Sequence, residues 1–181
     1  MMDNDLIPAW LDGDLRPLDK LDVHRRGLRH LAVSVFVLSA GKVLIQQRAA
    51  GKYHTPNLWA NTCCTHPHWG ETAADCANRR LAQELGIKGL RMAHAGQVEY
   101  RAEVGGGLTE HEVVEVFTAD APADLAMALN PSEVQAVRWV DLYDLAAETR
   151  RWPDRFTPWL RIYLSEHMER IFGPELRRVV T

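Results

Sequence analysis

Apolar residues along the chain form several runs that have the composition of β-strands. Residues 31–38, LAVSVFVL, are rich in β-branched side chains and are followed, after the turn sequence SAG, by 42–48, KVLIQQR. These two runs predict a hairpin. Residues 95–104 and 110–120 flank the glycines at 105–107 and predict a second hairpin, because glycines readily form a turn.

Helical periodicity is clearest in residues 71–86, ETAADCANRRLAQELG, where apolar residues up to Leu85 recur at helical spacing and Gly86 is a stop signal. After a further strand predicted in AVRWVDL, the segments LYDLAAETR and FTPWLRIYLSEHMERIF are also helical in pattern. Strands interleaved with a few helices predict a mixed sheet with helices packed on its faces, which is an α+β fold.

The composition is that of a globular protein of one domain. The chain has 181 residues, 46% hydrophobic and 25% charged, with a net charge of −3, which argues against disorder and against a nucleic-acid partner. The N-terminal MMDNDLIPAW lacks the basic start and apolar core of a secretory signal. The longest uncharged apolar run, 31–41, is far shorter than the roughly 18 to 20 residues that span a bilayer. We therefore expect a cytoplasmic protein with no membrane span.

The densest chemistry lies in residues 61–71, NTCCTHPHWGE. Three cysteines cannot all pair, and a disulfide between the neighbours Cys63 and Cys64 would be badly strained, so we expect free thiols. Cys63 and Cys76 are expected to be small buried hydrophobes. Cys64 has the same alternative, but it could also exchange a proton or attack an electrophile.

Two short segments carry further candidate groups. Pro67 and Gly70 predict a bend that places Cys64 and His66 at the start of the helix, where backbone N–H groups favour anions. The segment HRRGLRH carries His24 and His30 six residues apart. This spacing predicts a loop that leads into the first strand, not a pair of ligands on one helix.

Glu110 and Glu112 alternate along a predicted strand, so both carboxylates face one side while His111 faces the other. Like charges this close repel unless a cation or a proton lies between them. The alternative is a solvated strand face. With His24, His30 and His66 the two acids would offer three nitrogens and two oxygens, a donor set suited to octahedral Mg²⁺, Mn²⁺ or another divalent ion.

Cationic residues recur around the same segments, and they are Lys20, Arg48, Lys52 and Arg80. Each could be solvated surface. Arg80 and Glu84 lie four residues apart on the predicted helix and share a face, so they could form a surface salt bridge or meet a phosphate together with a metal ion.

The segments LWANTCCTHPHWGE, HRRGLRH, RRLAQELG and EHE together resemble the type I isopentenyl diphosphate isomerases, and the match runs from Lys20 to Trp159. These enzymes belong to the Nudix superfamily. The resemblance implies a single Nudix-like domain over residues 1–181, with a mixed β-sheet sandwiched between helices and an added N-terminal segment.

The motif of Nudix hydrolases is a glycine, five residues, a glutamate, seven residues and then Arg-Glu-apolar-x-Glu-Glu-x-Gly-apolar, and it can be aligned with residues 65–87. The motif residues that are kept are Glu71, Arg79, Leu81, Glu84, Gly86 and Ile87. The departures are Thr65 for the first glycine, Arg80 for the first acid of the cluster and Gln83 for the second. A hydrolase needs several carboxylates to gather divalent ions, so this motif is expected to serve a function other than hydrolysis.

The resemblance implies an enzyme that interconverts isopentenyl diphosphate and dimethylallyl diphosphate by moving a proton across the allylic system. The implied metal ligands are His24, His30, His66, Glu110 and Glu112. The implied catalytic residues are Cys64, Glu112, Tyr100 and Trp159, the last facing the cationic carbon. The implied diphosphate contacts are Lys20, Arg48, Lys52 and Arg80. Protonation of an alkene gives a tertiary carbocation, so the site needs a proton donor and a base on opposite faces and no stray water.

The implied cofactors are Mg²⁺ on the substrate diphosphate, bound through Glu84, and Mn²⁺ or Mg²⁺, or else Zn²⁺, at the site of three histidines and two glutamates. The partner is a small-molecule isoprenoid diphosphate, and we expect a monomer or a homodimer. Thr65 and Asn57 stand where these isomerases commonly have glycine, so the turns near Cys64 could differ. His54 and His68 lie close enough in sequence to be mistaken for ligands.

Two other functions stay open. One is a Nudix diphosphatase that cleaves a nucleotide or isoprenoid diphosphate with Glu71 and Glu84 around Mg²⁺. The other is a non-catalytic binding module that uses the five metal ligands for stability.

Overall fold

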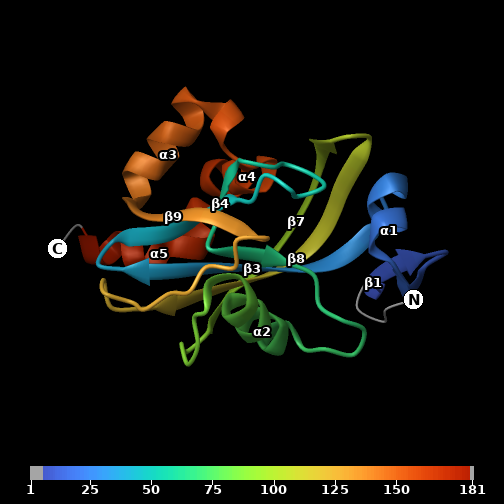
Figure 1. The fold of residues 1–181 in the computed structure, drawn as a ribbon, viewed down its shortest axis with the longest axis horizontal. Helices are drawn as coiled ribbons and strands as arrows, with labels where there is room; N and C mark the ends of the chain where they lie inside the picture. Colours follow the sequence, from blue (N-terminus) through green and yellow to red (C-terminus); the bar gives the residue numbers. More distant parts are fainter. Residues whose placement is uncertain (1–5, 180–181) are drawn as a thin grey trace.

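The computed structural model describes residues 6–179, and side chains up to residue 176. Figure 1 shows the order of its elements. The strands are β1 (Leu6–Leu11), β2 (Asp14–Asp19), β3 (Arg29–Ser39), β4 (Lys42–Arg48), β5 (Trp59–Ala60), β6 (Cys63–Thr65), β7 (Ala93–Gly105), β8 (Leu108–Asp120) and β9 (Val134–Asp141). The helices are α1 (Lys20–Arg26), α2 (Ala73–Leu85), α3 (Leu142–Arg151), η2 (Pro153–Arg155), α4 (Pro158–Glu166) and α5 (Met168–Val179).

Strand β3 is the centre of the sheet. It pairs antiparallel with β4 and parallel with β8, the latter in a register that runs from Arg29 opposite His111 to Leu38 opposite Asp120. Nearly all of its side chains are buried, as expected for a strand that is covered on both faces. Both predicted hairpins, β3–β4 and β7–β8, are confirmed, and the strand predicted after them is β9, which pairs with β4.

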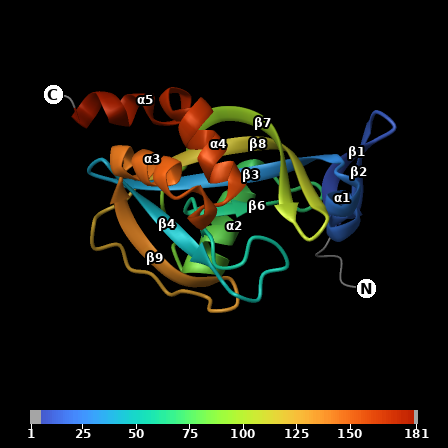
Figure 2. The ribbon, with the colours of Figure 1, turned by 90° about the horizontal axis from the view of Figure 1, so that it is seen from above.

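Helices cover both faces of the sheet, as Figures 1 and 2 show. On one face α2 packs Leu81 against Val33 and Val35. On the other face Phe36 of β3 contacts the rings of Tyr163 in α4 and Phe172 in α5, with centroids 5.6 and 4.9 Å apart. Because successive residues of a strand point to opposite faces, β3 supplies side chains to two separate cores.

The N-terminal segment forms the β1–β2 hairpin and the short helix α1 beside the first residues of β3. The expectation of a loop around His24 is wrong, because this residue lies within α1. Asp19 caps the helix by accepting a hydrogen bond from the backbone N–H of Asp22, and Gly27 ends it in the left-handed region with φ 61°. Val23 anchors the helix in a small cluster of buried apolar residues from β1.

The expected position of Cys64 and His66 at a helix N-terminus is also wrong. Cys64 lies on β6, opposite Ser34 of β3, and His66 follows that strand. The helix α2 begins only at Ala73, because Thr72 is its cap and accepts a hydrogen bond from the backbone N–H of residue 75.

The C-terminal helical run divides at His167, where φ is −129° and the backbone leaves the helical region. Because of this division, Ile171 and Phe172 of α5 pack in the same apolar core as the buried residues of α4. Among the described residues no helix is both long and apolar enough to cross a membrane.

Candidate active site

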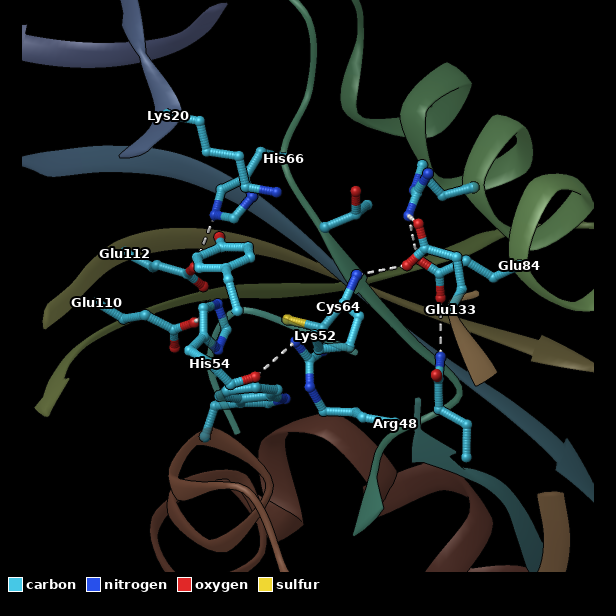
Figure 3. Close-up of a pocket in the computed structure, with 15 residues that line it drawn as sticks. Lys20, Arg48, Lys52, His54, Cys64, His66, Glu84, Glu110, Glu112 and Glu133 are labelled. Atoms are coloured by element: carbon cyan, nitrogen blue, oxygen red, sulfur yellow. Dashed lines mark hydrogen bonds and ion pairs between the residues drawn. The ribbon is translucent and has the colours of Figure 1, made fainter. Parts of the chain in front are cut away.

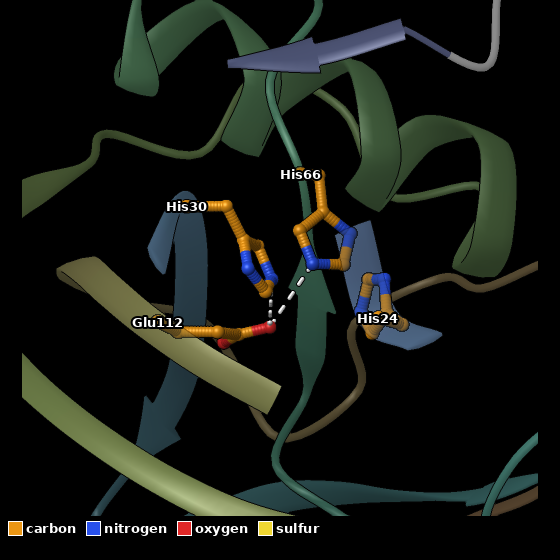
Figure 4. Close-up of side chains that lie close together, drawn as sticks. All are labelled: His24, His30, His66 and Glu112. Carbon is orange, nitrogen blue, oxygen red and sulfur yellow. Dashed lines mark hydrogen bonds and ion pairs between the residues drawn. The ribbon is translucent and has the colours of Figure 1, made fainter. Parts of the chain in front are cut away.

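Four of the predicted metal ligands meet beside α1, as Figure 4 shows. His24 comes from α1, His30 from β3, His66 from the segment after β6 and Glu112 from β8. Their ligand atoms all lie within 4.8 Å of one another. His30 and Glu112 are direct register partners across the parallel pair β3–β8, so the sheet itself positions half of this cluster.

The backbone orients two of these imidazoles. Nδ1 of His24 lies 2.6 Å from the carbonyl oxygen of Lys20, and Nδ1 of His30 lies 2.7 Å from the carbonyl oxygen of Leu28. A carbonyl only accepts, so each Nδ1 carries the hydrogen and each Nε2 keeps its lone pair. Both Nε2 atoms are buried and have no hydrogen-bond partner among the described residues.

These imidazoles are suited to a divalent cation. Burial lowers the pKa of His24 to about 4 and holds the pKa of His66 well below its usual value, so both rings are neutral at pH 7. The ring of His66 points Nε2 at Glu112 Oε1, 3.0 Å away. The Nε2 lone pairs of His24 and His30, together with a neutral His66 beside a carboxylate, form a site that a divalent ion would satisfy.

Glu110 lies beside this group and faces the same side of β8 as Glu112, as predicted. Both glutamates are buried, whereas His111 points to the other side and lies 3.2 Å from Glu99. Glu110 belongs to a second group of potential ligands with His24 and His54, again within 4.8 Å of one another. The structure therefore brings four of the five predicted ligands into one group and places Glu110 in a second group that shares His24.

Tyr100 on β7 joins the two carboxylates. Its hydroxyl lies 2.7 Å from Glu110 Oε2 and 2.8 Å from Glu112 Oε2. Burial and the charge of Glu112 raise the pKa of Glu110, while the imidazoles beside Glu112 outweigh burial and hold the pKa of Glu112 low. The surroundings therefore favour the neutral form of Glu110 and the charged form of Glu112.

Cys64 lines the same pocket as these carboxylates, and Figure 3 shows its sulfur between them and the cationic residues. Burial and the charges of Glu112 and Glu110 raise the pKa of the Cys64 thiol, so the protonated thiol is the form present at neutral pH. Ser34 donates a hydrogen bond to its sulfur at 3.4 Å. These surroundings favour Cys64 as a proton donor over Cys64 as a nucleophile.

All three thiols are free, as expected, and Cys63 and Cys76 are buried in the core under α2. Trp159 is 1% exposed, and its indole N–H donates to Asn61 Oδ1 at 3.1 Å, which fixes the ring as one wall of the pocket. Asn57 has φ 64°, so this asparagine adopts the left-handed conformation that a glycine would take.

The four predicted diphosphate contacts all line this pocket, namely Lys20, Arg48, Lys52 and Arg80. Burial and the neighbouring Lys52 and Arg80 lower the pKa of Lys20. The Nε atoms of Arg48 and Arg80 are buried with no hydrogen-bond partner among the described residues. Unused donors and crowded positive charge are the features of a site that receives an anion.

Acids balance part of this charge. Arg80 donates to Glu84 Oε1 at 2.6 Å and lies 3.4 Å from Glu133, which also accepts a hydrogen bond from Lys52. Gln46 donates to Glu84 Oε2 at 2.9 Å. The predicted Arg80–Glu84 pair is thus a salt bridge, and it lies in the pocket wall with Glu84 almost fully buried.

The first glutamate of the Nudix motif has a structural partner. Arg79 donates to both oxygens of Glu71, at 2.6 and 2.8 Å, and Glu71 also accepts from the backbone N–H of His68. This bidentate pair lowers the pKa of Glu71. Its carboxylate therefore braces the segment before α2 and is not grouped with other acids, which weighs against the hydrolase reading.

Sequence reasoning missed three residues that line the pocket, namely Gln46, Tyr53 and Glu133. Tyr53 and Glu133 lie on loops, and Gln46 lies on a strand, so no spacing links them to the other site residues. His54, which the sequence offered only as a residue that could be mistaken for a ligand, also faces the site.

Solved structures of low sequence identity share this fold. The crystal structure of DR0079 from Deinococcus radiodurans matches with a TM-score of 0.70 at 14% identity, over 88% of this chain and 96% of that one. The structure of a MutT NUDIX hydrolase from Burkholderia pseudomallei matches with a TM-score of 0.59 at 21% identity, over 77% and 98% of the two chains. The prediction of a Nudix-like α+β fold is therefore confirmed.

Sequence comparison is more specific. The NUDIX domain family matches residues 28–160. An isopentenyl-diphosphate Delta-isomerase from Cereibacter sphaeroides is 67% identical over 169 residues, which cover 93% of this chain and 96% of the relative. One from Rhodobacter capsulatus is 58% identical over 173 residues, 96% of this chain and 98% of the relative. The chain thus belongs to the Nudix superfamily and, within it, to the family of isopentenyl-diphosphate Delta-isomerases.

Proposed function

We propose that this protein catalyses the metal-dependent 1,3-allylic proton shift that interconverts isopentenyl diphosphate and dimethylallyl diphosphate. The observation that carries the proposal is a single pocket lined by the Cys64 thiol, the buried carboxyl group of Glu112 and four cationic side chains. The high identity to named isomerases supports the same reaction. We further propose that residues 1–181 form one domain that acts in the cytoplasm as a monomer or a homodimer.

The two proton-transfer groups are Cys64 and Glu112. In the direction of dimethylallyl diphosphate, the Cys64 thiol gives its proton to the terminal alkene carbon, which leaves a thiolate and a tertiary carbocation. Glu112 then takes a proton from the carbon on the diphosphate side of the cation, and the new double bond forms there. Before the next turnover Glu112 releases its proton to solvent and Cys64 takes one up, so atoms and charges balance over a full cycle. In the reverse direction the two groups exchange roles.

Trp159 protects the cation. The indole ring is fixed against the pocket, where its face can stabilise a positive carbon. A substrate bound between Trp159 and Cys64 would exclude water from the cationic carbon, which favours loss of a proton over capture of the cation by water.

The five-ligand site would hold Mn²⁺ or Mg²⁺, or Zn²⁺ as a further candidate, on His24, His30, His66, Glu110 and Glu112. Such an ion would supply positive charge that keeps the carboxylates ionised. Neutral imidazoles with two carboxylates leave a divalent ion formally neutral, so Glu112 can still exchange a proton.

Lys20, Arg48, Lys52 and Arg80 would bind the diphosphate and so orient the five-carbon chain toward Cys64. Glu84 would bind the second ion, Mg²⁺, together with the diphosphate oxygens, since Mg²⁺ commonly takes one or two carboxylates and completes its shell with phosphate and water.

The product formed from isopentenyl diphosphate and Mg²⁺ tests this function. Purified protein should yield dimethylallyl diphosphate without free phosphate, and in heavy water the product should gain deuterium. Release of phosphate or of the monophosphate would favour the diphosphatase. No turnover at full metal occupancy would favour the binding module.

A further inference from the structure

His54 has the geometry of a metal ligand, although it lies outside the five positions that the resemblance supplies. It follows Tyr53 in the segment between β4 and β5 and is 6% exposed. Its Nε2 lies 3.6 Å from Glu110 Oε1. The ligand atoms of His24, His54 and Glu110 all lie within 4.8 Å of one another.

The ring of His54 is oriented in the same way as two of the expected ligands. Its Nδ1 lies 3.0 Å from the hydroxyl oxygen of Thr55, as those of His24 and His30 lie close to backbone carbonyls. Histidines that bind metals usually donate the hydrogen of the other ring nitrogen to an oxygen, which fixes the tautomer and the ring. The carbonyls fix this tautomer in His24 and His30, and in His54 the Thr55 hydroxyl can accept the same hydrogen bond while Nε2 faces Glu110.

The backbone at His54 is held in an uncommon conformation. Thr55 has φ 46°, in the left-handed region that a β-branched residue rarely adopts, and Asn57 has φ 64°. Thr55 is nevertheless almost fully buried. Strained residues of this kind persist where the surrounding structure requires them, and they cluster at functional sites.

We propose that His54 is a sixth protein ligand of the divalent ion, on the side of Glu110. The proposal rests on the metal site of the proposed function and deepens it. His24 belongs to both groups of candidate ligands. With bonds of about 2.1 Å, the donor atoms around an octahedral ion lie about 3 to 4.2 Å apart. An ion that binds both groups would therefore draw the side chains of His54 and Glu110 toward the other ligands.

Six protein ligands would have a chemical consequence. Four neutral imidazoles and two carboxylates would enclose the ion completely and leave no open position for substrate. Closed coordination is the mark of a structural ion, whereas catalytic ions keep a position for water or substrate. The ion in this chain would thus hold Glu112 and the histidines in place without touching the five-carbon chain.

The test compares metal binding by three single variants of the full chain, His54→Ala, His30→Ala and His68→Ala. Metal-free protein is titrated with Mn²⁺ to obtain the affinity, and Co²⁺-loaded protein is examined by visible absorption, which is more intense for five-coordinate than for six-coordinate Co²⁺. His68 is the matched control because it is a partly buried histidine next to the site that belongs to neither group of candidate ligands.

His54→Ala should lower the Mn²⁺ affinity by at least about 10-fold, the smallest loss typical even for a residue that only supports a ligand. Its Co²⁺ absorption should also become more intense, while His68→Ala keeps the affinity and the spectrum of the wild type. An unchanged affinity would overturn the proposal. So would a weaker affinity with an unchanged spectrum, because His54 would then only position other ligands.

Two measurements keep the result clear. X-ray absorption of the Mn²⁺-loaded wild type should show six donors with four imidazole rings; three rings would overturn the proposal even if His54→Ala does not fold. His30→Ala tests the underlying site. If the wild type binds no ion tightly and His30→Ala changes nothing, the proposed metal site itself fails. If His30→Ala loses Mn²⁺ affinity and His54→Ala does not, only the sixth ligand is refuted.

Discussion

At the scale of single residues, Cys64 is a small, partly buried side chain that lines the pocket. The proposed proton transfer needs its thiol, whereas its neighbours on β6 hold the strand by backbone pairing with β3. Cys64→Ala should therefore abolish turnover, with a loss of at least about 10² to 10⁴ in kcat, and leave the fold and metal content largely intact. Product assays, circular dichroism and metal analysis check this. Substantial remaining activity would remove Cys64 from the mechanism.

Ser34 is expected to position that thiol. It donates to the Cys64 sulfur and shares a hydrogen bond of 2.8 Å with the hydroxyl of Tyr163. Ser34→Ala removes both, and loss of the bond to the sulfur, worth about 1 kcal/mol, should lower kcat roughly 5- to 10-fold. KM should stay constant because Ser34 is not among the residues that line the cationic side of the pocket. A rise in KM at constant kcat would assign Ser34 to substrate binding instead.

The sequence predicted some site residues for reasons of geometry and could not predict others. Glu110 and Glu112 were readable because alternation on a strand places them on one face, and the structure buries both. The role of His54 depends on the left-handed conformation of Thr55, and Glu133 reaches Lys52 from a loop. No local spacing encodes either contact, because each is made between segments that only the folded chain brings together.

At the scale of elements, the longest strands and α2 were predictable and the shortest elements were not. Periodicity needs a window of about 11 to 18 residues, whereas α1 has seven residues and β6 has three. These two short elements carry His24 and Cys64. For α1 the usable signals were its caps, Asp19 and Gly27. The elements that matter most for the chemistry are thus the ones that pattern analysis detects least well.

The end of α2 gives a stability prediction. Gly86 has φ 67°, and an added Cβ would lie 2.8 Å from the Cβ of Ala128. Gly89 has φ 75°, and no described atom outside its chain neighbours lies within 4 Å of a Cβ added there. Gly89→Ala should lower the free energy of unfolding by about 1 to 2 kcal/mol through the backbone alone. Gly86→Ala should lower it by roughly 1 to 3 kcal/mol more because of the clash. Urea unfolding measures both, and equal losses would contradict the clash.

At the scale of the whole molecule, the sequence predicted which segments are strands but not how all of them pair. The two hairpins follow from short turns. The parallel pairing of β3 with β8 joins segments far apart in the chain, and the N-terminal hairpin packs through a small cluster of its own. Such pairings depend on which apolar faces match in three dimensions. Only the resemblance to a known family supplied that information.

The buried histidines predict how stability depends on pH in the metal-free protein. The folded pKa of His24 is about 4, below its usual value of 6.5, so between these pH values the unfolded chain binds a proton that the folded chain does not. The free energy of unfolding should fall as pH drops from 6.5 to 4, by on the order of 3 kcal/mol for this residue. Glu110, with a raised pKa, acts in the opposite sense: it stabilises at low pH, and that stability is lost as pH rises.

Comparison with His24→Gln separates the two contributions. In chelator-treated protein, urea unfolding from pH 6.5 to 4 should show a steeper loss of stability for the wild type than for this variant, because Glu110 remains in both. Parallel curves would mean that His24 does not resist protonation in the folded state.

Because His30 pairs with Glu112 across β3 and β8, binding of the ion should report when these two strands come together during folding. A growing chain on the ribosome has His24 and His30 long before Glu112 emerges, and neither half alone contains enough donors to hold a cation tightly. Capture of the ion should therefore coincide with the moment when the two distant strands align, so the arrival of a luminescent or paramagnetic metal would report the pairing of β3 with β8.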